Sequence, residues 1–316
     1  MHLALIGFGN IGKVHADVLR ETTNRTGIVL HAVADIKEKP TFEDVYFVLD
    51  YKELLRRNDI DAVSIATPPD SHYAITLDAL RAGKHVLVEK PPALNLEHLK
   101  ELERTAKEQG VVLFTAFHAT HRPEVAAARK ALQGNIIKEI TITYKEFVLN
   151  YHDANGWIFD PHIAGGGVLM DSGINALSVL YSILPDLPKL RIDSVMLKKA
   201  QNFRVETSAN VTFSVERQGS GILDMDWMYQ GPEVRQIVFR TESDEYIVDI
   251  VQSNFLKNGV VVEGKTQQGR EMVDQYLEYR GVYVDFAAHV AAGTSSVRTA
   301  ELRFVLDTYR KGNRSF

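Results

Sequence analysis

The residues best suited to acid–base chemistry stand together at Glu89-Lys90-Pro91-Pro92, directly after the apolar run Val86 to Val88. A run this short and β-branched predicts a buried parallel strand, so Glu89 and Lys90 fall at its carboxyl end. Ligands of open α/β sheets bind at that edge. The two prolines end the strand and restrict the backbone, which would hold the Lys90 ammonium at a defined point. On this segment alone, a solvated lysine at a strand exit is the competing interpretation.

A glycine-rich turn near the N-terminus predicts a dinucleotide site. An apolar strand pattern leads into Gly7-Phe8-Gly9-Asn10-Ile11-Gly12, and a helical pattern follows. The three glycines permit a tight turn, the approach of a pyrophosphate and close helix–strand packing, with the phosphates over the helix N-terminus. Asp35 ends the next predicted strand, where an acidic residue binds the ribose hydroxyls and repels a 2'-phosphate. NAD is therefore the predicted cofactor, and Lys37 and Lys39 leave NADP as the alternative.

Strand and helix patterns alternate through the first third of the chain, which predicts a doubly wound parallel sheet. Thr67 and Pro68 close a strand beside the glycine turn, where backbone would meet the ribose or nicotinamide. From the residues alone, His72 and His85 are expected to be structural. The elements expected after the glycine turn are a strand at 29–34, a helix at 51–57, a strand at 62–66, a helix at 72–82, a strand at 86–90, a helix at 96–109 and a strand at 111–117.

From about residue 119 the pattern changes to long alternating runs, which predict an antiparallel sheet with one open face. An apolar helix expected at 167–184 carries Asp171 and Asn175 four residues apart, and so on one face. The predicted fold class is α/β plus α+β: a Rossmann domain at residues 1–118 and a substrate-binding and oligomerisation domain at 119–316. Its strands are expected at 138–148, 190–197, 208–216, 221–229, 234–240, 245–251 and 260–263.

Composition favours a small-molecule partner. The 316 residues include 36 basic and 41 acidic residues, for a net charge of -5, which argues against a general nucleic-acid or anionic-membrane surface. There are no cysteines, and the histidines lack metal-ligand spacing, so no metal site is expected. We see neither a signal-peptide pattern nor an uninterrupted membrane-length apolar run, and expect a cytoplasmic protein.

Four motifs in order resemble the glucose-fructose oxidoreductase, inositol dehydrogenase and MocA family. The resemblance covers nearly the whole chain. It implies the two-domain fold above, a lysine of the E-K-P motif beside the nicotinamide and the reacting carbon, and a cis bond before Pro91. The motifs are Gly7 to Gly12, Thr67-Pro68-Pro69 with His72, Glu89-Lys90-Pro91, and Gly166-Gly167 leading to Asp171-x-Gly173-x-Asn175.

One departure narrows the resemblance. The family pattern ends D-x-G-x-H with a histidine as acid/base, whereas Asn175 stands there in this chain and cannot exchange a proton at neutral pH. The chain is similar in this respect to a subgroup, the bacterial aldose 1-dehydrogenases that oxidise L-arabinose, D-galactose or L-fucose at the anomeric carbon. The matching segments are Phe117-His118, Lys145-Glu146, Tyr151-His152, Trp157-Ile158, Asp171 to Ser178, Asp226-Trp227, Gly231-Pro232 and Tyr279-x-x-x-Tyr283-x-x-Phe286.

The subgroup resemblance implies the site. Lys90 would polarise O1 or pass on its proton, Asp171 would orient Lys90 or accept the proton, and Asn175 would hydrogen-bond the anomeric hydroxyl. Tyr151 stands where a tryptophan is expected, which leaves the choice among sugar epimers open. The implied sugar contacts are His118, Glu146, Tyr151, His152 and Trp227, and the cofactor contacts add Ala66, Thr67, Pro68, His72, Glu89 and Lys90 to the glycine turn and Asp35.

Each of these residues could instead have a purely structural role. Glu146 would then face solvent, His152 would belong to a turn, Trp227 to the core, and Tyr279 and Tyr283 to helix packing. Two other functions also remain open: a dehydrogenase or reductase acting on a polyol ring carbon such as inositol, and a dinucleotide-sensing regulatory protein without catalysis. A homo-oligomer through the open sheet is expected.

Overall fold

The computed structural model describes residues 1–216, 219–264 and 275–312. The chain forms two compact units, one of Met1–His118 with Gln275–Thr299 and one of Ala119–Asp274 with Ala300–Phe316. The sequence predicts a single boundary at residue 118. Helix α8 (Gln275–Ala292) nevertheless belongs with the first unit, because Tyr279, Val282, Tyr283 and Phe286 are buried in that unit's hydrophobic core.

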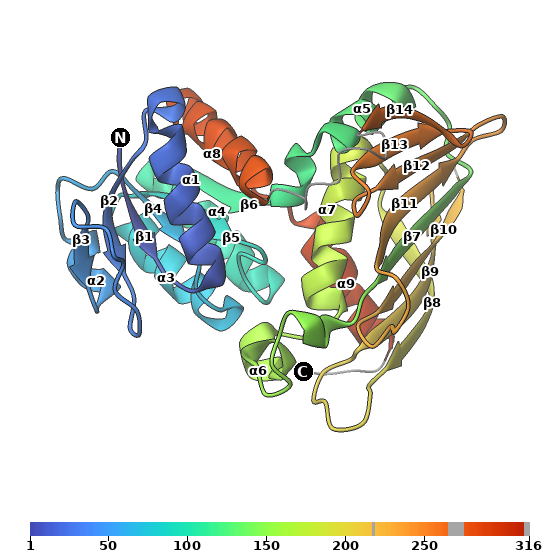
Figure 1. Cartoon of the computed structure of the whole chain (residues 1–316), viewed down its shortest axis with the longest axis horizontal. Coiled ribbons are helices and arrows are strands. Elements are labelled where there is room, and N and C mark those ends of the chain that lie inside the picture. Colours follow the sequence, from blue (N-terminus) through green and yellow to red (C-terminus); the bar gives the residue numbers. More distant parts are fainter. Residues whose placement is uncertain (217–218, 265–274, 313–316) are drawn as a thin grey trace. The chain divides into compact units, whose positions relative to one another are not determined.

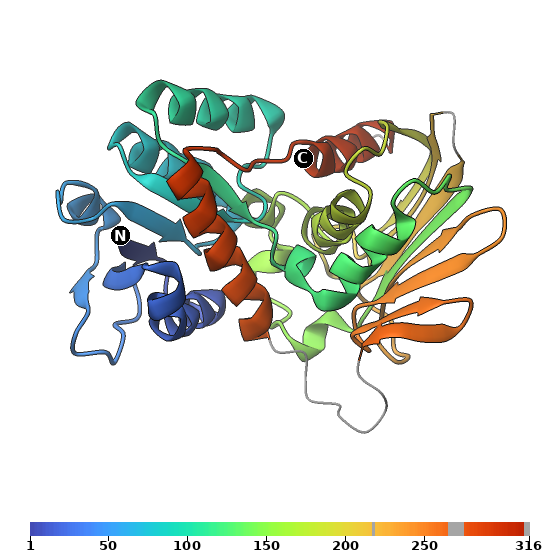
Figure 2. The same ribbon diagram turned by 90° about the horizontal axis from the view of Figure 1, so that it is seen from above.

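The first unit is a six-stranded parallel sheet in the order β3-β2-β1-β4-β5-β6, which confirms the predicted Rossmann sheet. Helices α1 and α8 pack together on one face, and α3 and α4 on the other (Figure 2). Its elements are β1 (His2–Ile6), α1 (Asn10–Thr26), β2 (Val29–Ala34), β3 (Tyr46–Val48), α2 (Tyr51–Leu55), β4 (Ala62–Ile65), α3 (Pro69–Arg81), β5 (His85–Glu89), α4 (Leu96–Gln109) and β6 (Leu113–Ala116).

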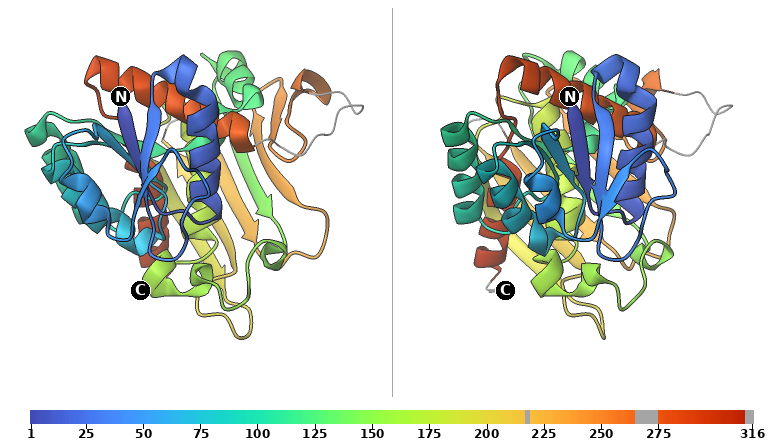
Figure 3. Two further views of the ribbon diagram at one scale, coloured as in Figure 1. Left: turned by 60° about the vertical axis from the view of Figure 1, so that its left-hand side comes forward. Right: turned by 90° about the vertical axis from the view of Figure 1, so that its left-hand side faces the viewer.

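Local sequence explains where these helices begin and end. The side chain of Asn95 caps α4 by accepting the amide of His98 at 2.8 Å, and Gly110 ends that helix in the left-handed conformation. Proline at the first position starts α3. Helix α1 begins at Asn10, and its N-cap residue Gly9 has no side chain to cap it, so its N-terminal amides stay available to a ligand. Figure 3 shows α1 and α8 beside the parallel strands.

The second unit is an eight-stranded sheet with helices α5 (Pro123–Leu132), α7 (Ile174–Ile183) and α9 (Ala300–Lys311) against one face (Figure 1). The open antiparallel sheet of the prediction is mixed in one place, because β7 pairs parallel with β10 and antiparallel with β11. The strands are β7 (Glu139–Lys145), β8 (Leu190–Lys198), β9 (Ser208–Val215), β10 (Ser220–Asp226), β11 (Val234–Arg240), β12 (Glu245–Asp249), β13 (Asn254–Lys257) and β14 (Val260–Gly264), in the order β14-β13-β12-β11-β7-β10-β9-β8.

The apolar segment Pro161–Ile183 is the part of the second unit that carries Asp171. It is the one described segment long and apolar enough to cross a membrane, but 78% of its most apolar window is buried inside the protein. A short helix, α6 (Pro161–Ala164), comes first, then a π-helical turn at Leu169–Gly173, and then α7. The segment is therefore a core helix, and the π turn marks the place where Asp171 lies.

Candidate active site

The glycine turn of the first unit has the geometry of an anion site. Gly7 has a φ of +94°, and a Cβ there would lie 2.7 Å from the Ala66 carbonyl; a Cβ on Gly12 would lie 2.2 Å from the Gly7 oxygen. Around Gly9 no atom of the described residues lies within 4 Å of a Cβ position, and the first turn of α1 carries no acidic residue. Phosphate oxygens can thus approach the helix N-terminus, and these residues fit the pyrophosphate of a dinucleotide.

Asp35 follows β2 beside this turn. Its carboxylate accepts the amides of Phe8 at 2.7 Å, Lys37 at 2.7 Å and Glu38 at 2.8 Å. Burial works against its ionisation, but these amides outweigh burial and lower the pKa of Asp35. The negative charge expected at the ribose end is therefore held by backbone donors. Lys13 pairs with Glu38 at 2.7 Å in the same region.

His72 joins two loops that the resemblance assigned to the cofactor. One ring nitrogen lies 2.6 Å from the carbonyl oxygen of Thr67 and the other 2.8 Å from that of Pro91. The ring is buried, and burial lowers its pKa against the opposing effect of the two carbonyls. His72 therefore fixes the turn after β4 to the turn after β5. The Thr67 hydroxyl accepts from Ser71 at 2.7 Å, and Pro68 precedes α3.

Behind Lys90 lies a buried carboxylate. Glu89 is the last residue of β5, and its Oε1 is bound by Nε2 of His15 at 3.0 Å and by the hydroxyl of Tyr279 at 2.7 Å, while Oε2 accepts the Lys90 amide at 3.2 Å. Burial opposes ionisation, but these donors, led by His15, lower the pKa of Glu89 to about 2. Lys90 itself is half-buried, and the Lys90–Pro91 bond is cis, as the resemblance implied.

Helix α8 extends this network. His118 Nδ1 pairs with the buried carboxylate of Glu278, and its ring stacks on Tyr279 with centroids 5.2 Å apart. Tyr283 binds Nδ1 of His15 at 2.7 Å and Ser64 at 3.1 Å. The sequence grouped His118 with the sugar contacts of the second domain and treated the two tyrosines as packing. In the structure Tyr279 and Tyr283 belong to the hydrogen-bonded cluster around Glu89, and His118 stacks on Tyr279 at its edge, while the role of His118 as a sugar contact stays a prediction.

In the second unit, Asp171 lies in the π turn and Asn175 one turn later in α7. π turns inside helices are frequent at functional sites. Asp171 is half-buried, and its amide donates to the Gly167 carbonyl at 3.1 Å. Oδ1 of Asn175 is buried and accepts no hydrogen bond from the part of the chain that the structure describes. Such an unsatisfied acceptor suits a ligand hydroxyl.

Glu206 anchors the start of this turn. Its Oε1 accepts the amides of Gly167 at 2.9 Å and Leu169 at 3.2 Å and the Tyr309 hydroxyl at 2.6 Å. A Cβ on Gly167 would lie 2.0 Å from the Glu206 backbone oxygen, which explains the glycine. Glu206 is fully buried, and burial raises its pKa despite these donors. Its Oε2 has no partner among the described residues.

Glu146 connects the π turn to the sheet. It is 8% exposed, so the solvent-facing interpretation is wrong. Oε1 accepts the Ser172 hydroxyl at 3.3 Å, and Oε2 lies 2.5 Å from Nη2 of Arg235. The indole N–H of Trp227 donates to the Ser172 oxygen at 2.9 Å, and Trp227 is fully buried. Trp227 therefore supports the π turn from the core, as its blander interpretation had it.

Tyr151 and His152 follow a short 3-10 helix, Val148–Asn150. Tyr151 is 58% exposed and donates its hydroxyl to Glu233 at 2.9 Å. His152 is half-buried and meets Trp157 edge-on, with ring centroids 6.4 Å apart. Both side chains thus belong to the loop that follows β7 and Glu146.

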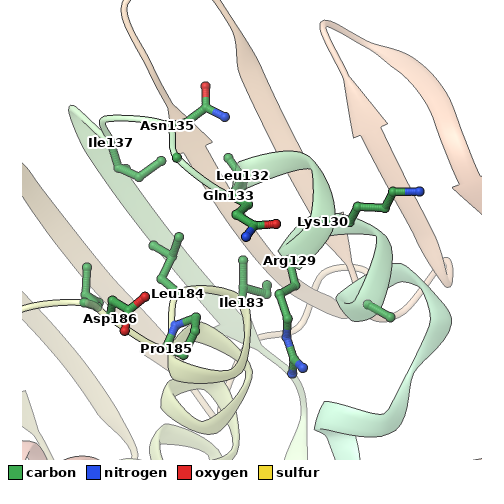
Figure 4. Close-up of a pocket in the computed structure, with 13 residues that line it drawn as sticks. Arg129, Lys130, Leu132, Gln133, Asn135, Ile137, Ile183, Leu184, Pro185 and Asp186 are labelled. Carbon is green, nitrogen blue, oxygen red and sulfur yellow. The ribbon is translucent and has the colours of Figure 1, made fainter.

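A cavity of about 520 Å³ lies elsewhere in the second unit, between the ends of α5 and α7 (Figure 4). Arg129 points along its wall and donates to the Ser182 carbonyl at 2.5 Å. None of the predicted site residues lines this cavity. The volume of this cavity does not by itself indicate a reaction, so we define the candidate site by the polar residues described above.

Several residues of these clusters were not predicted. Arg235 lies on an alternating strand and Glu206 in a loop, and neither carries a motif. His15 lies three residues after Gly12, on the helix face that packs against the sheet, and a polar residue at such a position is a usable signal. Glu278 and Tyr279 fall more than 150 residues after His118, and their pairing depends on the return of α8 to the first unit.

The fold and the two polar clusters define a dinucleotide-binding oxidoreductase, and comparison with known proteins agrees. Residues 1–117 match the family described as an oxidoreductase family with an NAD-binding Rossmann fold. The chain is 30% identical over 316 residues to galactose 1-dehydrogenase of Pseudomonas fluorescens, a match that covers 99% of this chain and 96% of that protein. It belongs to the glucose-fructose oxidoreductase, inositol dehydrogenase and MocA family.

Solved structures give the same result. A D-galactose-1-dehydrogenase protein from Rhizobium etli has a TM-score of 0.84 and 30% identity, with coverage of 98% of this chain and 94% of that one. Levoglucosan dehydrogenase in complex with NADH and levoglucosan has a TM-score of 0.83 at 19% identity, covering 99% and 96%. At 19% identity, the similarity to levoglucosan dehydrogenase supports the fold alone. Both extend over the two units of the chain.

Proposed function

We propose that this protein oxidises an aldopyranose of the D-galactose, L-arabinose or L-fucose type at C1 with NAD and releases the aldonolactone. The similarity to galactose 1-dehydrogenase over almost the full length of both proteins supports the substrate class. The observation that carries the reaction is Asn175, an amide with an unsatisfied buried acceptor one turn after Asp171. An acceptor there suits the anomeric hydroxyl, and the proton must go to another residue.

The reaction removes a proton from O1 and a hydride from C1. NAD, when bound, supplies the hydride acceptor. Lys90 polarises O1 with its ammonium or relays the O1 proton, and Asp171 supplies the negative charge that orients Lys90 or receives that proton. Asn175 holds O1 by a fixed hydrogen bond. His72, which ties the Thr67 and Pro91 carbonyls together, and Glu89, which holds the Lys90 amide, position the lysine.

The sugar ring is recognised by polar groups of the second unit. Glu146 is a buried carboxylate that still has lone pairs beyond those used by Ser172 and Arg235, so it can accept two vicinal hydroxyls. His152 and Tyr151 lie on the following loop and contact the same ring. Buried acceptors of this kind reject sugars that lack the matching hydroxyl, because the acceptor would be left unpaired.

The test is NADH formation by purified protein with a panel of D-galactose, L-arabinose, L-fucose, D-xylose, D-glucose and myo-inositol. The account expects turnover on the galacto-configured sugars and a preference for NAD over NADP, because the Asp35 carboxylate repels a 2'-phosphate. Turnover on myo-inositol alone would replace the proposal by a polyol dehydrogenase. Tight NAD binding without turnover of any substrate would favour the regulatory protein.

We also propose that the open face of the second sheet joins copies of the chain. One cross-strand row on that face runs through Ile222, Val238, Ile247 and Leu256, all half-exposed. Val238→Glu would place a charge in the middle of this row and should convert an oligomer to monomers in sedimentation velocity. An unchanged sedimentation coefficient would contradict the proposal.

A further inference from the structure

A chain of hydrogen bonds crosses the second unit from the π turn to the loop that follows β7. Ser172 donates to Glu146 Oε1 at 3.3 Å, and Arg235 lies 2.5 Å from Glu146 Oε2. The Nε of Arg235 lies 2.6 Å from Glu233, whose other oxygen accepts the Tyr151 hydroxyl at 2.9 Å. Side chains from three separate segments, the π turn, the loop after β7 and the start of β11, are thus joined in one chain of contacts.

Arg235 is the central link, because one guanidinium serves two carboxylates. Its side chain is 35% exposed, against 10% for Glu146 and 26% for Glu233. Burial would lower its pKa, but the two carboxylates raise the pKa further above its ordinary value, so the charge is permanent. The guanidinium fork has a fixed geometry, and so it fixes the direction of the Glu146 carboxylate.

The position of Arg235 depends on Glu233, and that of Glu233 on Tyr151. The Tyr151 hydroxyl donates a hydrogen bond to one oxygen of Glu233 and so occupies part of the acceptor capacity of that carboxylate. Without that hydroxyl, Glu233 can draw the guanidinium toward itself and away from Glu146. The N–H of a tryptophan at position 151 would lie at a different place on the ring from the tyrosine hydroxyl. The tyrosine found here therefore positions Glu233 in a way that a tryptophan would not.

We propose that Arg235 is a specificity-determining residue, coupled through Glu233 to Tyr151, that sets the direction in which Glu146 accepts sugar hydroxyls. The inference rests on the proposed oxidation of aldoses and adds how one ring epimer is chosen. D-Galactose and D-glucose differ only in the direction of one hydroxyl. A carboxylate with a fixed direction distinguishes them, and a loosely held carboxylate does so less well.

The experiment compares kcat/KM for D-galactose and D-glucose in the full-length chain. Arg235→Met should reduce the galactose-to-glucose ratio about tenfold and Tyr151→Phe about threefold, because each loosens Glu146 to a different degree. In the double variant the ratio should equal that of Arg235→Met alone, since both changes act on one chain. Thermal unfolding of each variant checks that it is folded.

The control lies on the same strand. Arg240 also joins two carboxylates, Glu139 at 3.0 Å and Glu245 at 2.9 Å, but none of its partners is a site residue. Arg240→Met should leave the ratio unchanged. If Arg235→Met fails to fold, Glu233→Gln decides instead, because Glu233 binds both Arg235 and Tyr151 and is not one of the proposed sugar contacts.

The outcomes separate this inference from the proposed function. A wild type that oxidises no aldose defeats the proposed function, and the inference falls with it. A wild type that is active, with variants that lose kcat/KM equally for both sugars, overturns the inference alone. Multiplicative effects in the double variant would also overturn it, because they would show that Arg235 and Tyr151 act separately.

Discussion

Each unit contains a buried carboxylate behind a proposed catalytic residue, and the two have opposite pKa shifts. Glu89 in the first unit is 7% exposed and has a pKa lowered to about 2, while Glu206 in the second is fully buried and has a raised pKa. His15 and Tyr279 bind one oxygen of Glu89 and the Lys90 amide binds the other, whereas the described donors to Glu206 all reach one oxygen and its second oxygen has no described partner. The balance between burial and hydrogen-bond donors sets the direction of each pKa shift: the donors outweigh burial at Glu89, and burial outweighs the donors at Glu206.

The difference suits the residue that each carboxylate supports. Glu89 accepts the amide of Lys90, and an ionised carboxylate there attracts the cationic side chain that follows. Glu206 holds Gly167, whose carbonyl accepts the amide of Asp171. The raised pKa of Glu206 makes a second negative charge behind the turn that carries Asp171 less favourable.

The largest expected effect comes from the residues in front of the two carboxylates. Lys90→Ala and Asp171→Asn should each lower kcat/KM for the sugar by about 10²–10⁴, because each removes a group that we propose handles the O1 proton. NAD binding, followed by fluorescence titration, should survive in both. Lys100→Ala, an exposed lysine on α4, is the control. Near-normal rates in both site variants would refute the assignment.

Replacing the carboxylates themselves should separate them in stability. Glu89→Gln should cost about 3–5 kcal/mol in the free energy of unfolding, because it removes the charged acceptor of two buried hydrogen bonds, each worth about 1.5–3 kcal/mol. Glu206→Gln should be neutral or slightly stabilising, since an amide resembles a protonated carboxyl and avoids burying a charge. Urea denaturation at neutral pH gives both values. Equal losses would remove the contrast between the two units.

The pH dependence of stability should sharpen the contrast. A lowered pKa means that Glu89 stabilises the fold fully above its unfolded value of 4.5 and that this stability is lost as the pH falls toward 2. A raised pKa means that Glu206 favours the fold below 4.5 and that this contribution is lost as the pH rises through the folded value. The difference in unfolding free energy between wild type and Glu89→Gln should become smaller in acid. The unfolding free energy of Glu206→Gln should increase relative to that of wild type as the pH rises. Parallel curves for both variants would contradict the assignment.

A smaller effect should distinguish two tyrosines on helix α8. Tyr279→Phe removes a donor to an ionised carboxylate and should cost about 1.5–3 kcal/mol in unfolding free energy. Tyr276 lies one turn earlier, and Tyr276→Phe removes a solvent-exposed hydrogen bond to the Asp17 carboxylate. This change should alter the free energy of unfolding by less than about 0.5 kcal/mol. Thermal and urea unfolding would measure both. A similar loss in the two variants would show that the Glu89 cluster is not the cause.

The sequence predicted what depends on local pattern. The strand, glycine turn and helix at residues 3–19 and the exit of β5 at Lys90 follow from apolar periodicity and proline, and both are found. The resemblance supplied Asp171 and Asn175. Contacts across long sequence separations could not be predicted, because nothing in a local pattern signals that Glu278 pairs with His118 or that Tyr309 reaches Glu206. The parallel pairing of β7 with β10 was missed for the same reason.

The most direct test of the central claim is the fate of the C1 hydrogen. D-Galactose carrying deuterium at C1 would be oxidised with NAD, and the NADH and the sugar product would be analysed by mass spectrometry. The account predicts one deuterium in the NADH, none in the product, and the lactone as the first product formed. Deuterium retained at C1 of an oxidised product would show that another carbon reacts and would contradict the proposed chemistry.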